Sequence, residues 1–407
     1  MFYSKFDLIN IMDKMRNMEI DSMSDDYEKK YQEKNGLSTK RVYFSLLKSM
    51  INTGILYQPH SFYLGGLVYS SITCSVIGYF TLICMLWLSK AHDKFGGTYA
   101  EIAGLALGRN GIYLLDSIIF ITQFGPGAIN IGFIIDLIQR SLSILSIELS
   151  DLILALILSF ILIPLCLIKS LKDQFWAHVT ADIIILTSIF IIGCYSLLNI
   201  SSSNITIIDP NYTIYTLGTL VYGFEGIPLL LPVKETMRSP KKFHSIVSYM
   251  IITIVIVYLI FCFVNNLAFG AELNELVILN LPDHWWVAFV LMAYCLAVTL
   301  TMPLVLNPVF TISEKYFGVT EKWVNLSRIC FILCVILAGS LAKGYLGICV
   351  SFIGGVFSSP LAFIFPAIIH LKLLAKTKNQ RIQSSLMIIM GIFFGIAATI
   401  STIYSYI

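Results

Sequence analysis

One acidic residue lies in an apolar stretch that is interrupted by helix-breaking residues, in the run Tyr222-Gly223-Phe224-Glu225-Gly226-Ile227-Pro228. Transfer of a charged group into a membrane interior is costly, so a carboxyl group there is a candidate for function. Burial favours the neutral form of a carboxyl group, and Glu225 could therefore take up and release a proton. The alternative is a permanently hydrogen-bonded Glu225 that braces the interrupted segment. The sequence leaves both roles open.

A second apolar stretch is interrupted in the same way, in the run Asn52-Thr53-Gly54-Ile55-Leu56-Tyr57-Gln58-Pro59. Helices opened at both runs would free backbone N–H and C=O groups, which inside a membrane must line protein or a cavity. Helix N-termini suit a carboxylate and free carbonyls suit an ammonium, so the pair favours a zwitterionic amino acid. The alternative is two ordinary kinked helices. The predicted substrate site comprises Asn52, Thr53, Gly54, Ile55, Leu56, Tyr222, Gly223, Phe224, Glu225 and Gly226.

Two more polar residues are candidates for the same site because they lie beside helix-breaking residues. Gln123 begins the run Gln123-Phe124-Gly125-Pro126-Gly127, and Asn307 precedes Pro308. In inverted-repeat transporters the third and eighth spans pack against the first and sixth. By that analogy of fold, Gln123 and Asn307 are predicted to line the cavity.

Three aspartates in apolar stretches have structural explanations. Asp116 and Asp182 are expected to pair with Lys or Arg, and Asp136, near an outer edge, is expected to be solvated. His178 and Asp182 have the spacing of an acyltransferase base, but no nucleophile or donor-binding motif accompanies them. The nine cysteines form neither a CxxC motif nor metal-ligand spacing. We therefore predict no enzyme, no metal site and no cofactor.

Composition places all these residues in a membrane protein. Of the 407 residues, 57% are apolar and only 13% are charged, against about a quarter charged in soluble domains. A span needs about 20 apolar residues. The sequence predicts an all-α fold with a tail at 1–40 and a transmembrane domain at 41–407, with eleven spans at about 42–64, 67–89, 111–138, 152–169, 174–198, 213–232, 244–269, 285–312, 323–342, 345–371 and 386–406.

The two interrupted runs fall in spans 1 and 6, which are the first spans of two groups of five. This register predicts a five-plus-five inverted repeat with discontinuous spans 1 and 6 and an appended span 11. With a cytosolic N-terminus, every Lys and Arg except Arg140 and Lys343 lies on the cytosolic side. The glycosylation candidates Asn204, Asn199 and Asn211 then fall in one outer loop, and the C-terminus is extracellular or luminal.

The run at 222–228, with Leu231-Pro232 and Met237-Arg238-Ser239-Pro240, closely resembles the F-E-G…L-P…M-K-x-P signature of the amino acid/auxin permease family. Its proton-coupled and vacuolar amino acid transporter branch is the most similar. Three other stretches resemble that family in the correct order: Thr53-Gly54-Ile55-Leu56 with Pro59, Leu279-Asn280-Leu281-Pro282, and Gly354-Gly355 through Ser359-Pro360-Leu361-Ala362-Phe363-Ile364-Phe365-Pro366. The resemblance covers about 40–375. The sequence differs from the pattern of that family at Ser49, Asn52 and Lys234.

The resemblance implies eleven spans, the five-plus-five fold and amino acid substrates moved with H⁺ or Na⁺. We predict a secondary active transporter that moves neutral amino acids by alternating access, with H⁺ favoured over Na⁺ as coupling ion. A nutrient-sensing receptor on the same fold and a Na⁺-coupled transporter are the alternatives. The expected partners are the amino acid and the lipid bilayer, without nucleic acid or an obligate protein partner. The location is the plasma membrane or a vacuolar or lysosomal membrane.

Overall fold

The computed structural model describes residues 37–51, 53–168, 175–200, 208–209 and 212–404. Within these ranges the chain is helical, and its only β-type pairing is an isolated bridge between Leu37 and Met237. The predicted tail at 1–40 therefore lies mostly outside the described residues. An all-helical membrane fold agrees with the class that composition predicts.

The first half of the chain forms helices whose bounds follow the apolar runs. They are α3 (Thr39–Met50), the 3₁₀ turn η1 (Thr53–Tyr57), α4 (Gln58–Gly65), α5 (Leu67–Phe95), α6 (Tyr99–Leu107), α7 (Arg109–Ile144), α8 (Asp151–Leu167) and α9 (Phe175–Leu198). The short helix α6 was not predicted. It begins with a capping box, in which the Thr98 hydroxyl accepts from the Glu101 N–H and the Glu101 carboxylate accepts from the Thr98 N–H.

The second half has the same kind of elements. They are α10 (Thr213–Gly223), α11 (Ile227–Glu235), η2 (Pro240–Lys242), α12 (Phe243–Phe269), η3 (Gly270–Glu272), η4 (Val277–Asn280), α13 (Trp285–Phe317), α14 (Val324–Ala342), α15 (Leu346–Phe352), η5 (Ile353–Ser358), η6 (Pro360–Ile364), α16 (Phe365–Ile369), η7 (His370–Leu374) and α17 (Lys378–Tyr404). The segments η5, η6 and η7 are π-helical, so span 10 is wound more widely than an α-helix over much of its length.

Nine helical segments among the described residues are long and apolar enough to cross a membrane. The remaining two predicted spans have different forms. The apolar helix α8 has 17 residues, and the segment from Thr39 to Gly65 is divided into short helices. The chain is a multi-pass membrane protein, while the count of eleven crossings and the inverted repeat stay predictions.

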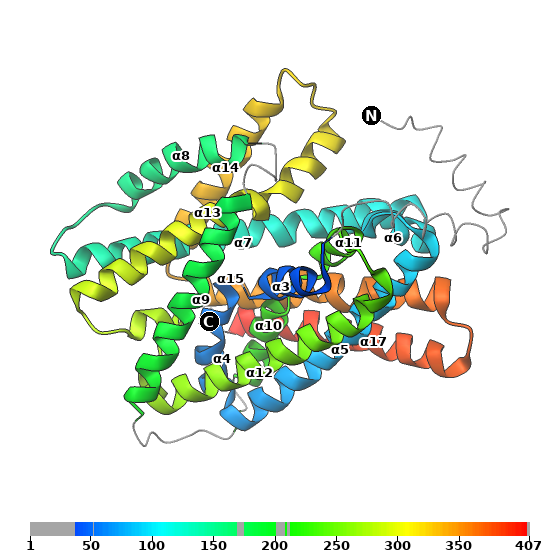
Figure 1. Ribbon diagram of the computed structural model, residues 1–407, viewed down its shortest axis with the longest axis horizontal. Coiled ribbons are helices and arrows are strands. Elements are labelled where there is room, and N and C mark those ends of the chain that lie inside the picture. Colours follow the sequence, from blue (N-terminus) through cyan, green and yellow to red (C-terminus); the bar gives the residue numbers. More distant parts are fainter. Residues whose placement is uncertain (1–36, 52, 169–174, 201–207, 210–211, 405–407) are drawn as a thin grey trace.

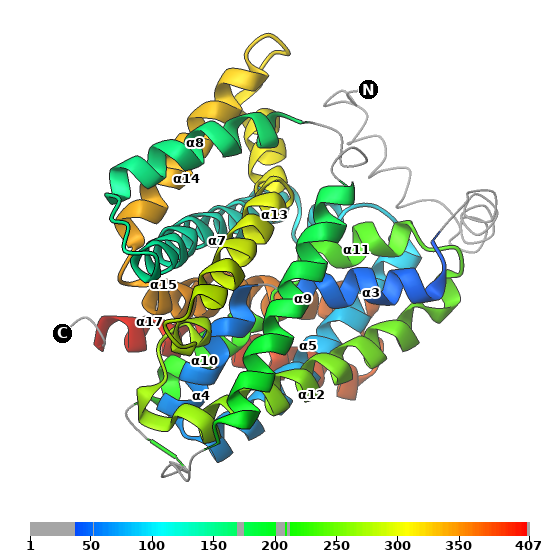
Figure 2. The same cartoon turned by 60° about the vertical axis from the view of Figure 1, so that its left-hand side comes forward.

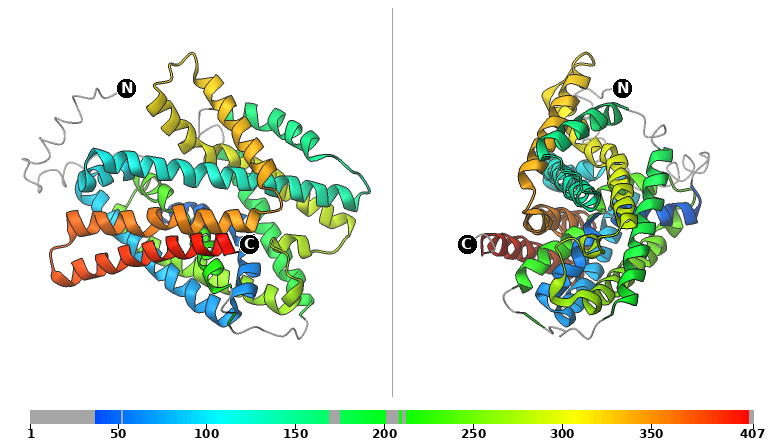
Figure 3. Two further views of the ribbon diagram at one scale, coloured as in Figure 1. Left: turned by 180° about the vertical axis from the view of Figure 1, so that it is seen from behind. Right: turned by 90° about the vertical axis from the view of Figure 1, so that its left-hand side faces the viewer.

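The long helix α7 runs through the middle of the fold, with α8 and α14 on one side and α5, α10 and α12 on the other (Figures 1 and 2). Span 10 packs against both α10 and α17, and Figure 3 shows α17 alongside it. Two glycines of span 10 allow its backbone to lie close to both helices. A Cβ added to Gly354 would lie 2.1 Å from the carbonyl oxygen of Gly218 in α10, and one added to Gly355 would lie 1.8 Å from the Cβ of Ala398 in α17. Small residues at such contacts are typical of helix packing in membranes.

Candidate functional site

The predicted break in span 1 lies at the end of α3. The helix ends at Met50, and Ile51 leaves helical geometry with a ψ angle of 85°. Asn52 lies outside the described residues. From Thr53 to Tyr57 the chain forms the buried 3₁₀ turn η1, so the predicted open segment 52–56 is mostly a tight helical turn. Glycine and proline indicate where an α-helix ends, and they do not exclude a 3₁₀ continuation.

The break in span 6 lies where glycine residues predicted it. Helix α10 ends at Gly223, and α11 begins at Ile227. The N–H groups of Phe224 and Glu225 donate to the carbonyls of Val221 and Tyr222, at 3.1 Å each, so the end of α10 is tightened into a turn. These bonds satisfy the carbonyls of Val221 and Tyr222, which would otherwise lack a partner at the end of α10.

A tyrosine in span 7 joins the two breaks. The hydroxyl group of Tyr258, which is fully buried on α12, lies 2.7 Å from the carbonyl oxygen of Gly223 and 3.3 Å from that of Met50. These carbonyls belong to the last residues of α10 and α3. The interrupted ends of spans 1 and 6 are therefore neighbours, and one donor stabilises both of them.

Glu225 lies in the span 6 break and is held by side chains from spans 10 and 3. The hydroxyl of Ser358 donates to Glu225 Oε2 at 3.0 Å, and the amide of Gln123 donates to Oε1 at 3.4 Å. Gln123 and Glu225 are both only half-buried. Gln123 thus lies beside Glu225, while its place in the lining of a substrate cavity stays a prediction. Ser358 was not singled out from the sequence.

Side chains of span 1 form hydrogen bonds with two other helices, α7 and α10. The Thr53 hydroxyl donates to the Asn130 side-chain oxygen on α7 at 2.8 Å, and the Gln58 amide donates to the Thr219 carbonyl on α10 at 2.9 Å. The other amide atom of Gln58, Oε1, is buried without a hydrogen-bond partner among the described residues. A Cβ at Gly223 would lie 2.5 Å from Gln58 Nε2, so this glycine is needed for the close approach.

The site therefore combines two interrupted helices, an acid at one break and polar contacts from spans 3, 7 and 10. Residues 35–407 match the family described as transmembrane amino acid transporter protein. The chain belongs to this family. The match confirms the family that the signature motifs predicted.

Curated relatives from yeasts and a plant have comparable similarity over most of the chain. Vacuolar amino acid transporter 3 of Schizosaccharomyces pombe is 27% identical over 89% of this chain and 58% of its own length. Vacuolar amino acid transporter 4 of Saccharomyces cerevisiae is 27% identical over 92% of this chain and 58% of its own. An amino acid transporter of Arabidopsis thaliana is 26% identical over 88% of this chain and 90% of its own. The chain spans less than two thirds of the length of the two yeast relatives.

These relatives are named as transporters, not as enzymes. Among solved structures, a Na⁺-coupled sialic acid symporter in a substrate-bound, outward-open state matches with a TM-score of 0.48 and 12% identity, over 89% of this chain and 97% of its own.

Several predicted residues of this family member lie away from Glu225 or outside the described ranges. Asn307 is half-buried on α13, and its side chain makes no hydrogen bond to any described residue of the site. Asn199 is exposed, and its amide donates to the Tyr195 carbonyl, whereas Asn204 and Asn211 lie outside the described residues. The side chain of His178 also lies outside them.

The aspartates differ in their partners. Buried Asp116 accepts from Lys315 and from the Tyr316 hydroxyl at 2.7 Å each, which confirms its predicted pairing. Asp136 was expected to be solvated, but it is half-buried 3.7 Å from Lys343, which also contacts Asp151 at 2.8 Å. No group of three or more His, Cys, Asp or Glu within the described ranges is placed to hold a metal ion.

Lys234, which departs from the family signature, has partners of its own. Its ammonium is buried in α11 and donates to the Ser89 carbonyl and hydroxyl on α5 at 2.8 Å, and to Asp93 at 2.5 Å. A buried cation needs such partners to offset its lost hydration. The contact ties α11 to α5 one or two turns beyond the span 6 break.

Proposed function

We propose that this chain carries neutral amino acids across a membrane in symport with protons, by alternating access. The observation that carries the proposal is the junction of the two breaks. Glu225 lies in one break between side chains from spans 3 and 10, and Tyr258 joins that break to the other. An inverted-repeat transporter places its substrate at such a junction.

Helix ends at the junction offer opposite partial charges to the two charged groups of an amino acid. Helices α3 and α10 end there, and the carbonyl oxygens of Met50 and Gly223, which accept from Tyr258, each keep a second lone pair that suits an ammonium. Helix α11 begins there, and the Ile227 N–H at its start suits a carboxylate, since Pro228 has no N–H and the Leu229 N–H donates to the Gly226 carbonyl. Phe224 and Tyr222 are buried beside the break and supply apolar surface. This apolar surface favours an uncharged substrate side chain.

Glu225 is assigned the proton because its partners are neutral. Ser358 and Gln123 are the donors to its carboxyl group, and neither carries a charge. Asp116 differs, since Lys315 lies 2.7 Å from it and forms an ion pair with it. A half-buried acid held by neutral donors can be stable both with and without its proton. A brace alone would need no such freedom.

The relatives named as vacuolar transporters support a location in the membrane of a vacuole or a similar acidic organelle. A proton gradient across such a membrane would provide the driving force. The predicted orientation, with cytosolic N-terminus, would then place the loop between α9 and α10 in the lumen.

The test is uptake of neutral, acidic and basic amino acids into proteoliposomes that contain the purified full chain. We expect a pH gradient to drive accumulation of neutral amino acids and a Na⁺ gradient to have no effect. Glu225→Gln should abolish pH-driven accumulation, whereas exchange of substrate across the membrane should remain. The matched control is Glu148→Gln, which changes an exposed carboxyl group.

Three results would contradict parts of the proposal. Accumulation by Glu225→Gln at the normal level would remove the proton role and leave the bracing role. Accumulation that depends on a Na⁺ gradient and not on a pH gradient would identify Na⁺, and not H⁺, as the coupling ion. Substrate binding without any flux, measured on protein that unfolds cooperatively, would reject the transporter in favour of the nutrient-sensing receptor.

A further inference from the structure

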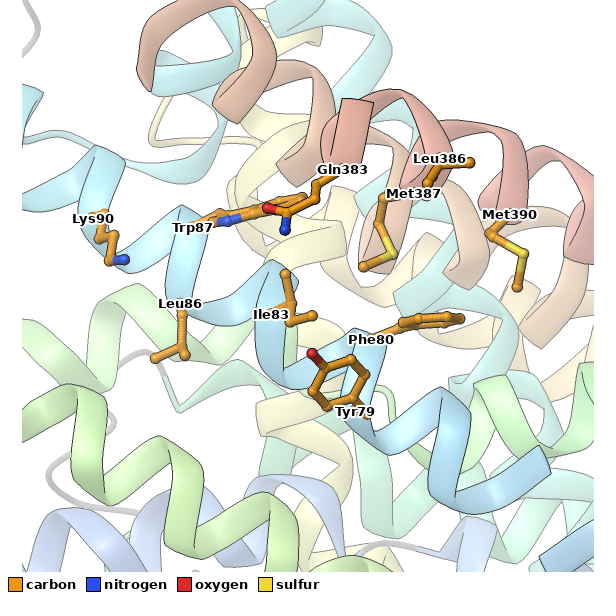
Figure 4. A pocket seen from close by; sticks show the side chains of 10 residues that line it. All are labelled: Tyr79, Phe80, Ile83, Leu86, Trp87, Lys90, Gln383, Leu386, Met387 and Met390. Atoms are coloured by element: carbon orange, nitrogen blue, oxygen red, sulfur yellow. The ribbon is translucent and has the colours of Figure 1, made fainter. Parts of the chain in front are cut away.

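A groove of about 540 Å³ lies on the membrane-facing side of the fold, between α5 and α17. None of its residues belongs to the breaks of spans 1 and 6. Figure 4 shows the side chains of both helices around it, and Tyr79 and Leu386 at its rim are each more than half exposed. Its lining is Tyr79, Phe80, Ile83, Leu86, Trp87, Lys90, Gln383, Leu386, Met387 and Met390.

The groove has the length of one lipid leaflet. Lys90 follows Tyr79 by eleven residues on α5, which is about 16 Å along an α-helix. Half of a bilayer core of about 30 Å is about 15 Å. On the opposite wall, Gln383 lies near the start of α17 and Met390 lies deeper in the span. The polar lining residues are therefore concentrated at one end, and aromatic and methionine side chains extend inward from it.

The polar end of the groove is positively charged. Lys90 is exposed and makes no ion pair with any residue that the structure describes. The connection between span 10 and α17 meets α5 at the same end of the fold, and it contributes four more cations: Lys372, Lys376, Lys378 and Arg381. No acidic residue lies in the groove lining. Charge complementarity therefore selects an anionic occupant over a zwitterionic one.

The floor of the groove is fixed by contacts that join three spans. The ring of Trp87 on α5 stacks on that of His370 in η7, with centroids 4.1 Å apart and an angle of 9° between the planes. His370 Nδ1 lies 2.7 Å from the hydroxyl of Ser384 on α17. Spans 2, 10 and 11 are thus linked beneath the groove by contacts that involve no occupant.

We propose that this groove binds an anionic glycerophospholipid of the cytosolic leaflet. One acyl chain lies along Tyr79, Ile83 and Met390, and the phosphate contacts Lys90. The proposal is independent of the transport function, because the groove shares no residue with the breaks. It predicts a lipid that stays bound through purification, unlike the exchanging lipids around the rest of the surface.

The first experiment compares two lipids with the same acyl chains by native mass spectrometry of the full chain in detergent. Dioleoyl phosphatidylserine should bind about fivefold more tightly than dioleoyl phosphatidylcholine, the effect of one lysine near a membrane surface. Lys90→Gln should reduce this preference, because Lys90 is the cation in the groove lining. Lys94→Gln is the matched control, because Lys94 is exposed one turn further along the same helix and lies outside the groove.

The second experiment fills the apolar part of the groove. Met390→Trp should weaken binding of both lipids, and Ile83→Phe, from the opposite wall, provides the same test should the first variant fold poorly. Thermal unfolding of the lipid-free proteins separates loss of binding from loss of fold. Equal affinity for the two lipids, equal effects of the two lysine variants, or full binding by both filled variants would show exchanging surface lipid only and would overturn the proposal.

Discussion

Replacement of Tyr258 by phenylalanine tests whether one hydroxyl group holds the two helix breaks together. The hydroxyl lies 2.7 Å from the Gly223 carbonyl and 3.3 Å from the Met50 carbonyl, so the first contact is the stronger one. Tyr258 is fully buried, and water cannot replace the lost donor without entering the core. A buried acceptor left unsatisfied costs about 1–3 kcal/mol, and we expect the free energy of unfolding to fall by that amount.

Tyr294 provides a matched control. It is also fully buried in the membrane domain, but its hydroxyl has no hydrogen-bond partner among the described residues. The cost of burying that hydroxyl is already present in the folded protein, so Tyr294→Phe should leave stability unchanged or raise it. The same change of one oxygen atom therefore has opposite expected effects at two tyrosines of equal burial.

The assay is thermal unfolding of the purified proteins in detergent, followed by the reactivity of buried cysteines such as Cys74 and Cys262. The difference between the two variants is the decisive quantity, since detergent shifts both midpoints alike. Uptake measurements should also show a higher KM for Tyr258→Phe, because the substrate must then order the breaks itself. Equal midpoints for the two variants, with KM unchanged, would refute the assignment of Tyr258.

Other contacts give further expectations. Gly218→Ala would place a Cβ 2.3 Å from a backbone carbonyl oxygen of span 10 and should lower the free energy of unfolding by about 1–3 kcal/mol. Gly193→Ala is the control, because its Cβ would meet open space, and it should change the free energy of unfolding little. Asp93→Asn should destabilise more than Lys234→Met in the same assay. Asp93→Asn removes the anionic partner of a buried ammonium, whereas Lys234→Met leaves a half-exposed carboxylate that water can solvate. Burial raises the pKa of Glu275, in the connection between α12 and α13, above its ordinary 4.5, so the ionised form is disfavoured by folding. Stability should therefore fall as the pH rises through that raised value, and Glu275→Gln should remove this fall in unfolding midpoints measured across acidic and neutral pH.

The sequence could predict the helix breaks because their cause is local. Glycine and proline weaken an α-helix locally, and the end of α10 at Gly223 agrees with that signal, although α7 continues through Pro126 and α13 continues through Pro303 and Pro308. What replaces the α-helix depends on tertiary packing, and the 3₁₀ turn from Thr53 to Tyr57 was therefore not foreseen. The short helix α6 did have a local signal, the Thr98-to-Glu101 capping box, which span counting passes over because the helix is too short to cross a membrane.

Residues that complete the site from other spans were harder to find. Asn130, Tyr258 and Ser358 lie in apolar stretches and none of them is part of the interrupted runs of spans 1 and 6. A lone polar side chain in such a stretch indicates that a partner exists, since a buried polar group needs a hydrogen bond. It does not indicate which of the other spans supplies the partner. The pairings of Asn130 with Thr53 and of Ser358 with Glu225 join residues far apart in the chain, and only the fold determines them.

The acids in apolar spans show the same division between sequence and structure. Asp116, Asp136 and Glu225 look alike in a sequence, each being a carboxyl group where lipid or protein excludes water. Their partners separate them: Lys315 pairs with the first and Lys343 lies near the second, while the third accepts hydrogen bonds from neutral side chains. The first two acids lie beside an ammonium, whereas a carboxyl group held by neutral donors has no ion pair to lose when it takes up a proton. Of these three acids, Glu225 is therefore the one whose charge can change during a transport cycle without breaking an ion pair.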